Sequence, residues 1–259
     1  KIDKNMFIDT HTHLFLEEFN HDRKEAVQRA IDVGVNQLIL PNVDSETLPA
    51  LKKMVNDFPA ICHPLFGLHP GSVKENFKEE LAIVREHLND ERCIGIGEIG
   101  LDFYWDDTFR KEQFEAFDTQ IKWAAEKNLP IVIHLRNSYQ EVIDIVRSNL
   151  QLGIKGVFHC FTGTKEEAAE IIEMGFLLGI GGIVTFKNSG LSETLKHIDL
   201  ANLVLETDSP YLAPVPFRGK RNESSYIEKV VEKLAEIYQL SKEEVAEITT
   251  TSAKNLFQI

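Results

Sequence analysis

The sequence has few cysteines and no long apolar run, and each shortage excludes a class of protein. Its 259 residues include three cysteines, Cys62, Cys93 and Cys160, which are odd in number and form no Cys-x-x-Cys pair. This usage excludes a disulfide framework and indicates a reducing compartment. The longest uncharged run, residues 174–186, is interrupted by glycines and is shorter than the ~18 residues that a membrane span needs.

Basic side chains are also in deficit, with 28 Lys and Arg against 41 Asp and Glu and a formal net charge of −13. A protein that coats nucleic acid by bulk attraction would carry the opposite sign, so any polyanion must be held locally. No signal peptide is recognisable, and we expect a cytoplasmic protein with no membrane contact and no obligate protein partner. Residues 1–5 precede Met6, a plausible start, and we take them as an added segment.

The chain does contain a repeated alternation of short β-branched apolar runs with amphipathic stretches. Eight such units in about 250 residues, with no linker between them, predict a single-domain α/β fold, a (β/α)₈ TIM barrel over residues 6–259, rather than an open doubly wound sheet. The predicted strands are 6–8, 37–40, 61–66, 93–96, 131–133, 156–158, 176–178 and 203–205. The predicted helices include 23–33, 78–88, 109–127, 139–150, 166–174, 227–238, 242–250 and 253–257.

Metal-ligating residue types follow five of the predicted strands. In chain order they are His11 and His13, Glu98, His134, His159 and Asp208. A barrel gathers the carboxyl ends of its strands at one mouth, where these side chains would meet. A His-x-His pair alone occurs easily by chance, but four histidines and two acids at strand ends together indicate a metal centre rather than unrelated polar residues.

Six ligands exceed the need of one tetrahedral ion, which predicts two divalent metal ions with a shared carboxylate. We expect Glu98 to be the bridge, since it lies between the two histidine groups in barrel order. His11, His13 and Asp208 are assigned to one ion and His134 and His159 to the other. Asp9, two residues before His11, should point to the same face of the strand as His11 and His13 and is expected to orient one of their imidazoles. Two divalent ions outweigh two carboxylates, so the centre should attract an anionic substrate.

Other catalytic motifs lack support. Residues 95–100 match Gly-x-Gly-x-x-Gly, but no helix opens at the last glycine, and Glu98 would place negative charge beside a pyrophosphate. There is no Gly-x-Ser-x-Gly elbow and no phosphate-binding loop of nucleoside triphosphatases. Cys160 is interpreted as a packing residue rather than a nucleophile, because no second base accompanies it.

Basic and aromatic residues near the predicted mouth are candidates for substrate contact. Arg136 and the segment containing Arg218, Lys220 and Arg221 could clamp phosphates, although a solvated loop is the alternative. Phe103, Tyr104, Trp105 and Phe161 could stack bases of an opened strand, or could be core residues. His69 could protonate a leaving group or bind phosphate, and a structural role is equally open.

The sequence resembles a known family, the TatD-type metal-dependent deoxyribonucleases of the amidohydrolase superfamily. The resemblance runs from Ile8 to Phe257. It is carried by Asp9-Thr-His11-Thr-His13, Gly67-Leu-His69-Pro70, Gly97-Glu98-Ile-Gly-Leu-Asp102-Phe-Tyr104, Phe158-His159-Cys-Phe161-Thr-Gly163, Glu206-Thr-Asp208-Ser-Pro210-Tyr-Leu-Ala-Pro214 and Arg218-Gly-Lys220-Arg221-Asn222. Two positions depart from the family pattern: Asn137 stands where an acid is usual, and Ser224 stands where proline is common.

The resemblance implies a nucleic-acid hydrolase, typically a 3′ to 5′ exonuclease, here on single-stranded DNA and by extension RNA. It implies that the same six residues hold the metals. We expect metal-activated water to attack phosphorus, with Glu98 and Asp208 as catalytic residues and Arg221 or Arg136 neutralising transition-state charge. Imidazole ligands favour zinc, manganese or cobalt, whereas the resemblance implies magnesium, so the metal stays open among these.

Three other functions remain open from the sequence. The same water could hydrolyse the ester between a D-amino acid and transfer RNA. A small-molecule amidohydrolase, lactonase or phosphotriesterase is a second alternative, but related binuclear barrels often bridge their metals with a modified lysine after the fourth strand, where this chain has Glu98. A scaffold protein without chemistry would be supported by an incomplete ligand set, and no ligand is missing.

Overall fold

Each predicted apolar run contributes to a strand in the computed structural model, which describes residues 6–259. The expectation that residues 1–5 are an added segment lies outside this range. The strands are β1 Phe7–Asp9, β2 Val35–Pro41, β3 Cys62–Leu65, β4 Ile96–Asp102, β5 Ile131–Arg136, β6 Gly156–Phe158, β7 Leu177–Ile180 and β8 Leu203–Leu205.

The strands pair in parallel and in chain order around a closed ring. Continuous ladders join β1 to β3 and β4 to β8. A parallel bridge between Phe66 and Ile96 connects the β3 side to β4, and another between Thr12 and Ser209 connects the β1 and β8 sides. The Thr10 N–H also donates to the Leu205 carbonyl at 3.0 Å. The predicted (β/α)₈ barrel is therefore confirmed.

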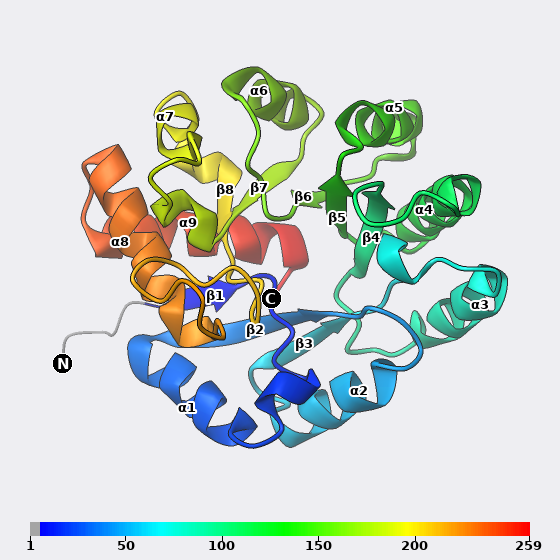
Figure 1. Cartoon of the computed structure of the whole chain (residues 1–259), viewed down its shortest axis with the longest axis horizontal. Coiled ribbons are helices and arrows are strands. Elements are labelled where there is room, and N and C mark those ends of the chain that lie inside the picture. The colour runs from blue at the N-terminus through cyan, green and yellow to red at the C-terminus, as the bar shows by residue number, and fades with distance from the viewer. Residues whose placement is uncertain (1–5) are drawn as a thin grey trace.

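Helices surround the strands on the outside (Figure 1). They are α1 Arg23–Val33, α2 Leu48–Asp57, α3 Phe77–His87, α4 Arg110–Lys127, α5 Tyr139–Asn149, α6 Lys165–Glu173, α7 Leu191–Leu195, α8 Ile227–Tyr238 and α9 Lys242–Phe257. Gly34 ends α1 in the left-handed conformation, with φ 106°, which glycine adopts without steric cost. No helix among residues 6–259 is long and apolar enough to cross a membrane.

Most predicted boundaries differ from the structure by one or two residues, and two differ by more. The segments 242–250 and 253–257 form one helix, α9, because Thr250 to Ser252 continue the helical ladder rather than break it. The fourth strand begins where its predicted range ends and extends to Asp102, so Glu98 lies inside β4 rather than after it. The polar character of Glu98 obscured a strand that is buried along its whole length.

A layer of apolar side chains fills the barrel interior below the mouth. It includes Ile8, Ile39, Leu65, Val132, Val157 and Val204 from the strands. Leu256 and Phe257 of α9 belong to the same cluster, so the C-terminal helix closes the end of the barrel opposite the mouth. Because side chains alternate along a strand, the residues two positions beyond these valines also face inward, one layer nearer the mouth.

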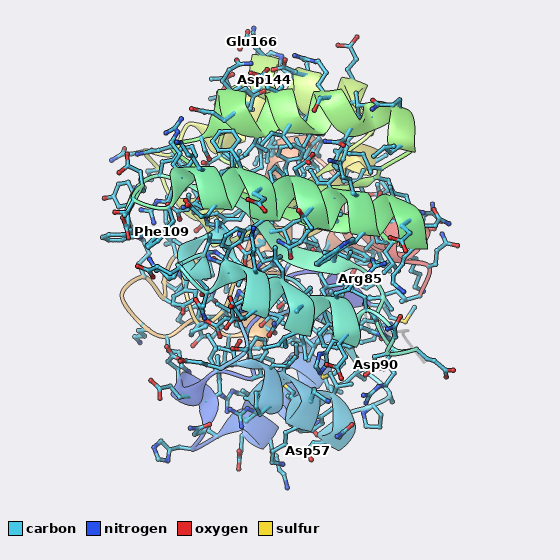
Figure 2. All side chains as sticks on the ribbon, turned by 90° about the vertical axis from the view of Figure 1, so that its right-hand side faces the viewer. Asp57, Arg85, Asp90, Phe109, Asp144 and Glu166 are labelled. Carbon is cyan, nitrogen blue, oxygen red and sulfur yellow. The ribbon has the colours of Figure 1, made fainter. Side chains whose placement is uncertain are left out.

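The helices begin at the mouth end and run back toward the closed end. In Figure 2, Phe109, which immediately precedes α4, lies on the left, whereas Arg85 in the last turn of α3 and Asp90 after it lie toward the right. Phe109 lines the cleft that opens at the mouth. The loops that follow the strands therefore gather on the Phe109 side, as the barrel fold requires.

Candidate metal centre

The six predicted ligands meet at the mouth of the barrel. His11 and His13 follow β1, Glu98 lies in β4 and His134 in β5, and His159 and Asp208 follow β6 and β8. Val132 and Val157 of the interior layer stand two residues before His134 and His159, so strand alternation directs both imidazoles inward. Segments up to 197 residues apart in sequence thus supply one cluster.

Glu98 occupies the middle of this cluster and uses its two oxygens on different sides. Its Oε2 lies 3.1 Å from His11 Nε2 and 3.6 Å from His13 Nε2. Its Oε1 lies 2.8 Å from His134 Nδ1 and 3.1 Å from His159 Nε2. One carboxylate therefore faces two pairs of imidazoles, the arrangement expected of a bridge between two ions.

Asp208 completes the group around His11 and His13. Its Oδ1 lies 3.6 Å from both Nε2 atoms. Those two nitrogens are only 3.2 Å apart, and each also faces a carboxylate. So many electron-pair donors converge on one point that a divalent cation would satisfy them together.

Three overlapping sets of side chains have ligand atoms within 4.8 Å of one another: His11, Glu98 and His159; His11, His13 and Asp208; and His69, Glu98 and His134. Most of these side chains are buried, so water screens them little. The donor set of nitrogen and carboxylate oxygen therefore fits divalent transition metals, as well as magnesium at the carboxylates.

The electrostatics of the centre keep its acids ionised. Burial raises the pKa of Glu98, but the neighbouring imidazoles, led by His159 and His11, outweigh burial and hold that pKa well below its usual value. Burial likewise raises the pKa of Asp208, but the hydrogen bond to His13 together with the charges of His159, His11 and His13 outweighs burial, so that this pKa is also lowered. Both carboxylates are thus available to a cation at neutral pH.

Two further carboxylates lie behind the imidazoles, and sequence reasoning assigned no role to either. Asp102 Oδ2 lies 2.9 Å from His134 Nε2, on the far side of that ring from Glu98. Glu206 Oε1 lies 3.3 Å from His159 Nδ1. Glu206 follows Val204 by two residues, the spacing that also places His134 and His159, and this periodicity was the signal that could have found it.

The orienting role expected of Asp9 is wrong. Its carboxylate accepts the backbone N–H of His11 at 3.3 Å and the backbone N–H of Thr207 at 3.0 Å, and the Thr207 hydroxyl donates to it at 2.6 Å. Asp9 therefore fastens the end of β1 to the end of β8 and contacts no imidazole through a hydrogen bond. Burial raises the pKa of Asp9 to about 7.

His69 lies at the edge of the centre. Its Nδ1 accepts the backbone N–H of Gly71 at 2.9 Å, which leaves Nε2 to carry the proton of a neutral ring. Nε2 lies 3.4 Å from Glu98 Oε1 and points into the cleft region. A hydrogen-bond donor is thus held beside the cluster, which is compatible with the expected contact to phosphate or a leaving group.

A cleft of about 810 Å³ opens above the centre. His13, Glu98, His134, His159 and Asp208 are among the residues that line it. On one side of the cleft Arg136 stacks on Tyr104, with its guanidinium carbon 3.8 Å from the ring centre, and lies 5.2 Å from the ring of Trp105. Trp105 is 76% exposed, and Tyr211, another lining residue, is 49% exposed.

The guanidinium of Arg221, which is expected to contact phosphate, is paired with an acid. Nη1 and Nη2 donate to the two oxygens of Asp22 at 2.6 and 2.7 Å. Arg218 stacks on Phe186, with 4.1 Å between the guanidinium carbon and the ring centre, and Lys220 is exposed. None of these three basic residues is among those that line the cleft.

Of the two roles left open for Phe161, base stacking or packing in the core, its burial favours the core. Its side chain is buried in the main apolar core, whereas Tyr104 is half exposed. Burial raises the pKa of the Cys160 thiol far above its ordinary value, in keeping with a packing residue. Of the two unusual positions, Asn137 adopts a left-handed backbone, which asparagine tolerates, and buried Ser224 donates to Thr12 Oγ1 at 3.2 Å.

Known proteins resemble this chain along nearly its whole length. The family model of TatD related DNase matches residues 8–258. The chain is 40% identical over 255 residues to the uncharacterized metal-dependent hydrolase YabD of Bacillus subtilis (strain 168), covering 98% of this chain and 100% of that protein. It is 31% identical over 257 residues to a protein of Pantoea vagans (strain C9-1) named 3′-5′ ssDNA/RNA exonuclease TatD. That match covers 97% of this chain and 99% of that protein.

A solved structure agrees with the fold. The crystal structure of YjjV, a TatD homologue from Escherichia coli K12, matches with a TM-score of 0.91 at 27% identity, and the match covers 98% of each chain.

Proposed function

Because the chain belongs to the TatD related DNase family, we propose that it is a metal-dependent hydrolase that cleaves phosphodiester bonds of single-stranded DNA or RNA from the 3′ end. One observation carries the proposal: Glu98 lies between two pairs of imidazoles on the floor of an open cleft. The name of the Pantoea vagans relative supports the direction and the single-stranded substrate. Residues 6–259 are proposed to act as one domain.

The proposed ligands are His11, His13 and Asp208 for one divalent ion and His134 and His159 for the other, with Glu98 shared. Bound divalent ions would supply Lewis-acid chemistry, lowering the pKa of water and polarising a phosphoryl oxygen. The identity of the ions is proposed to be magnesium, manganese or zinc. The chain's own residues then hold the substrate and move protons.

Asp208 is proposed as the group that accepts the proton of the attacking water. Its carboxylate lines the cleft, and its pKa is lowered, chiefly by the hydrogen bond to His13 acting against burial, so that it is ionised at neutral pH. His69 Nε2–H is proposed to donate to a phosphate oxygen or to the departing oxygen. Arg136, which lines the same cleft, is proposed to bind a neighbouring phosphate.

The rim of the cleft favours an unpaired strand as substrate. Trp105 and Tyr211 expose aromatic rings beside the centre, and unpaired bases stack on such rings for roughly 1–3 kcal/mol each. A duplex keeps the faces of its internal bases stacked on one another and cannot use these rings in the same way. Arg136 stacked on Tyr104 adds a fixed positive charge to the same rim.

The test is an assay on metal-stripped protein to which single metals are restored. End-labelled single-stranded DNA, RNA and aminoacylated transfer RNA serve as substrates. Stepwise shortening from the 3′ end would support the proposal. Release of the amino acid alone would establish the deacylase instead, and no cleavage of any polymer with any metal would overturn the proposed activity.

A further inference from the structure

Glu206 is a buried carboxylate that has no role in the proposed reaction. Its side chain is fully buried at the end of β8. Oε1 accepts the backbone N–H of Cys160 at 2.7 Å, and Oε2 has no hydrogen-bond partner among residues 6–259. A buried carboxylate that lacks a cation and a full set of donors is costly to folding. A second hydrogen-bond donor besides the Cys160 backbone would offset this cost.

The imidazole of His159 is the group best placed to be that partner. His159 Nδ1 lies 3.3 Å from Glu206 Oε1, while its Nε2 lies 3.1 Å from Glu98 Oε1 on the opposite edge of the ring. Nδ1 is itself buried and has no hydrogen-bond partner among the described residues. The ring thus stands between a carboxylate in the centre and a carboxylate behind it.

The neighbouring His134 has the same arrangement. Its Nδ1 faces Glu98 at 2.8 Å and its Nε2 faces Asp102 at 2.9 Å. In both cases one carboxylate lies toward the centre and a second lies on the far side of the imidazole. The Nδ1 atoms of His11 and His13, by contrast, have no hydrogen-bond partner within residues 6–259.

The fold makes room for the Glu206 carboxylate at Gly179 of β7. A Cβ atom at residue 179 would lie 2.3 Å from Glu206 Oε2, too close for any side chain to coexist with the carboxylate in this position. At Gly181, two residues further on, a Cβ would approach Glu206 no closer than 3.4 Å, which is an ordinary contact. The absence of a side chain at Gly179 therefore leaves room for the Glu206 carboxylate.

We propose that Glu206 is a positioning residue that accepts a hydrogen bond from Nδ1–H of His159 and so aims the free Nε2 of that ring at a metal ion. This role rests on the proposed metal centre. An acceptor behind a ligating imidazole fixes its tautomer and orientation and increases its basicity, and loss of such an acceptor typically costs 10–100-fold in metal affinity. The alternative is that Glu206 only anchors the Cys160 backbone, which has φ 50°.

The test measures Zn²⁺ binding by isothermal titration calorimetry on metal-stripped protein. Glu206→Gln keeps the shape and the Oε1 acceptor but removes the negative charge that strengthens the bond from Nδ1–H. Gly179→Ala leaves the carboxylate chemically intact but displaces it, although the new Cβ would also lie 3.2 Å from the Cα of His159. Both variants should lose about 10-fold or more in affinity for one of two ions. Gly181→Ala is the matched control and should bind as the wild type does.

Nitrogen-15 NMR of the zinc-loaded protein measures which ring nitrogen of His159 carries the proton. This quantity would not change if Glu206 only anchored the Cys160 backbone. The Nδ1 of His159 should carry the proton in the wild type, with its resonance shifted in Glu206→Gln. Wild-type zinc affinity in both Glu206→Gln and Gly179→Ala would overturn the role of Glu206 while leaving the metal centre intact. Absence of zinc binding in the wild type would overturn the centre and this role together.

Discussion

At the residue scale, the proposed two-ion centre depends on one carboxylate that faces two ligand groups. Glu98 uses Oε2 toward His11 and His13 and Oε1 toward His134 and His159. Replacing Glu98 by Gln changes the volume little but removes the charge that both ions would share. We expect Glu98→Gln to lower kcat by a factor on the order of 10² or more, since several kcal/mol of charge stabilisation are lost.

The same variant should retain fewer metal ions after gel filtration, measured by inductively coupled plasma mass spectrometry. Glu80→Gln is a suitable control, because Glu80 is also buried but bonds to Ser45 at a distance from the centre. A Glu98→Gln protein that keeps two ions and full activity would refute the shared carboxylate.

The titration of the histidines predicts a dependence of stability on pH. Burial lowers the pKa of His13, but hydrogen bonds to Asp208 and Glu98 outweigh it and raise that pKa to about 9, from 6.5. The stabilisation from this proton is complete below pH 6.5 and is lost as pH rises through 9. The pKa values of His134 and His159 are also raised, because Glu98 and the carboxylates behind the rings outweigh burial.

The metal-free protein should therefore lose stability between pH 6.5 and pH 9, while metal affinity rises over the same range because protons compete for the ligands. Urea unfolding at several pH values, with chelator and with Mn²⁺, measures both trends. A metal-free protein whose stability rises with pH in that window would contradict the assignment of His13.

At the scale of elements, the loops after β5 and β8 have different tasks although both contain arginines. Arg136 lines the cleft, whereas Arg221 is paired with Asp22, which precedes α1. Arg136→Ala should raise KM for single-stranded DNA about 10-fold or more, since a charge-assisted bond to phosphate contributes ~1.5–3 kcal/mol. Arg221→Ala should leave KM nearly unchanged and lower Tm.

Steady-state kinetics and thermal melting of the two variants separate these effects. The pair serves as a matched control, since each variant removes one guanidinium from a loop at the same mouth. Equal increases in KM would show that the segment around Arg221 binds substrate after all.

The sequence predicted the strands, the barrel and the meeting of the six ligands because these follow from local signals. Apolar runs identify strands, and the barrel brings their ends together. The sequence did not predict features that depend on tertiary contacts. The pairing of Arg221 with Asp22 and the burial of Phe161 depend on residues far away in the chain, and no periodicity predicts either contact. Asp9 was misassigned because strand alternation places it on the same face as His11, whereas its carboxylate accepts the backbone N–H of Thr207 and not an imidazole N–H.

At the scale of the whole molecule, the acidic chain and its proposed polyanionic substrate are reconciled only through the ions. The net charge of −13 opposes binding of nucleic acid, and the cleft floor carries Glu98 and Asp208. We expect metal-free protein to bind single-stranded DNA weakly and metal-loaded protein to bind it tightly. Fluorescence anisotropy with a nuclease-resistant phosphorothioate oligonucleotide, with and without Mn²⁺, measures the difference. Equal affinity in both states would mean that another surface holds the strand.

The most direct test of the two-ion centre is anomalous diffraction from crystals soaked in Mn²⁺, recorded on both sides of the manganese absorption edge. A two-ion centre should give two peaks in the barrel mouth, one beside His11, His13 and Asp208 and the other beside His134 and His159, with Glu98 between them. A single peak, or peaks that lie away from Glu98, would contradict it.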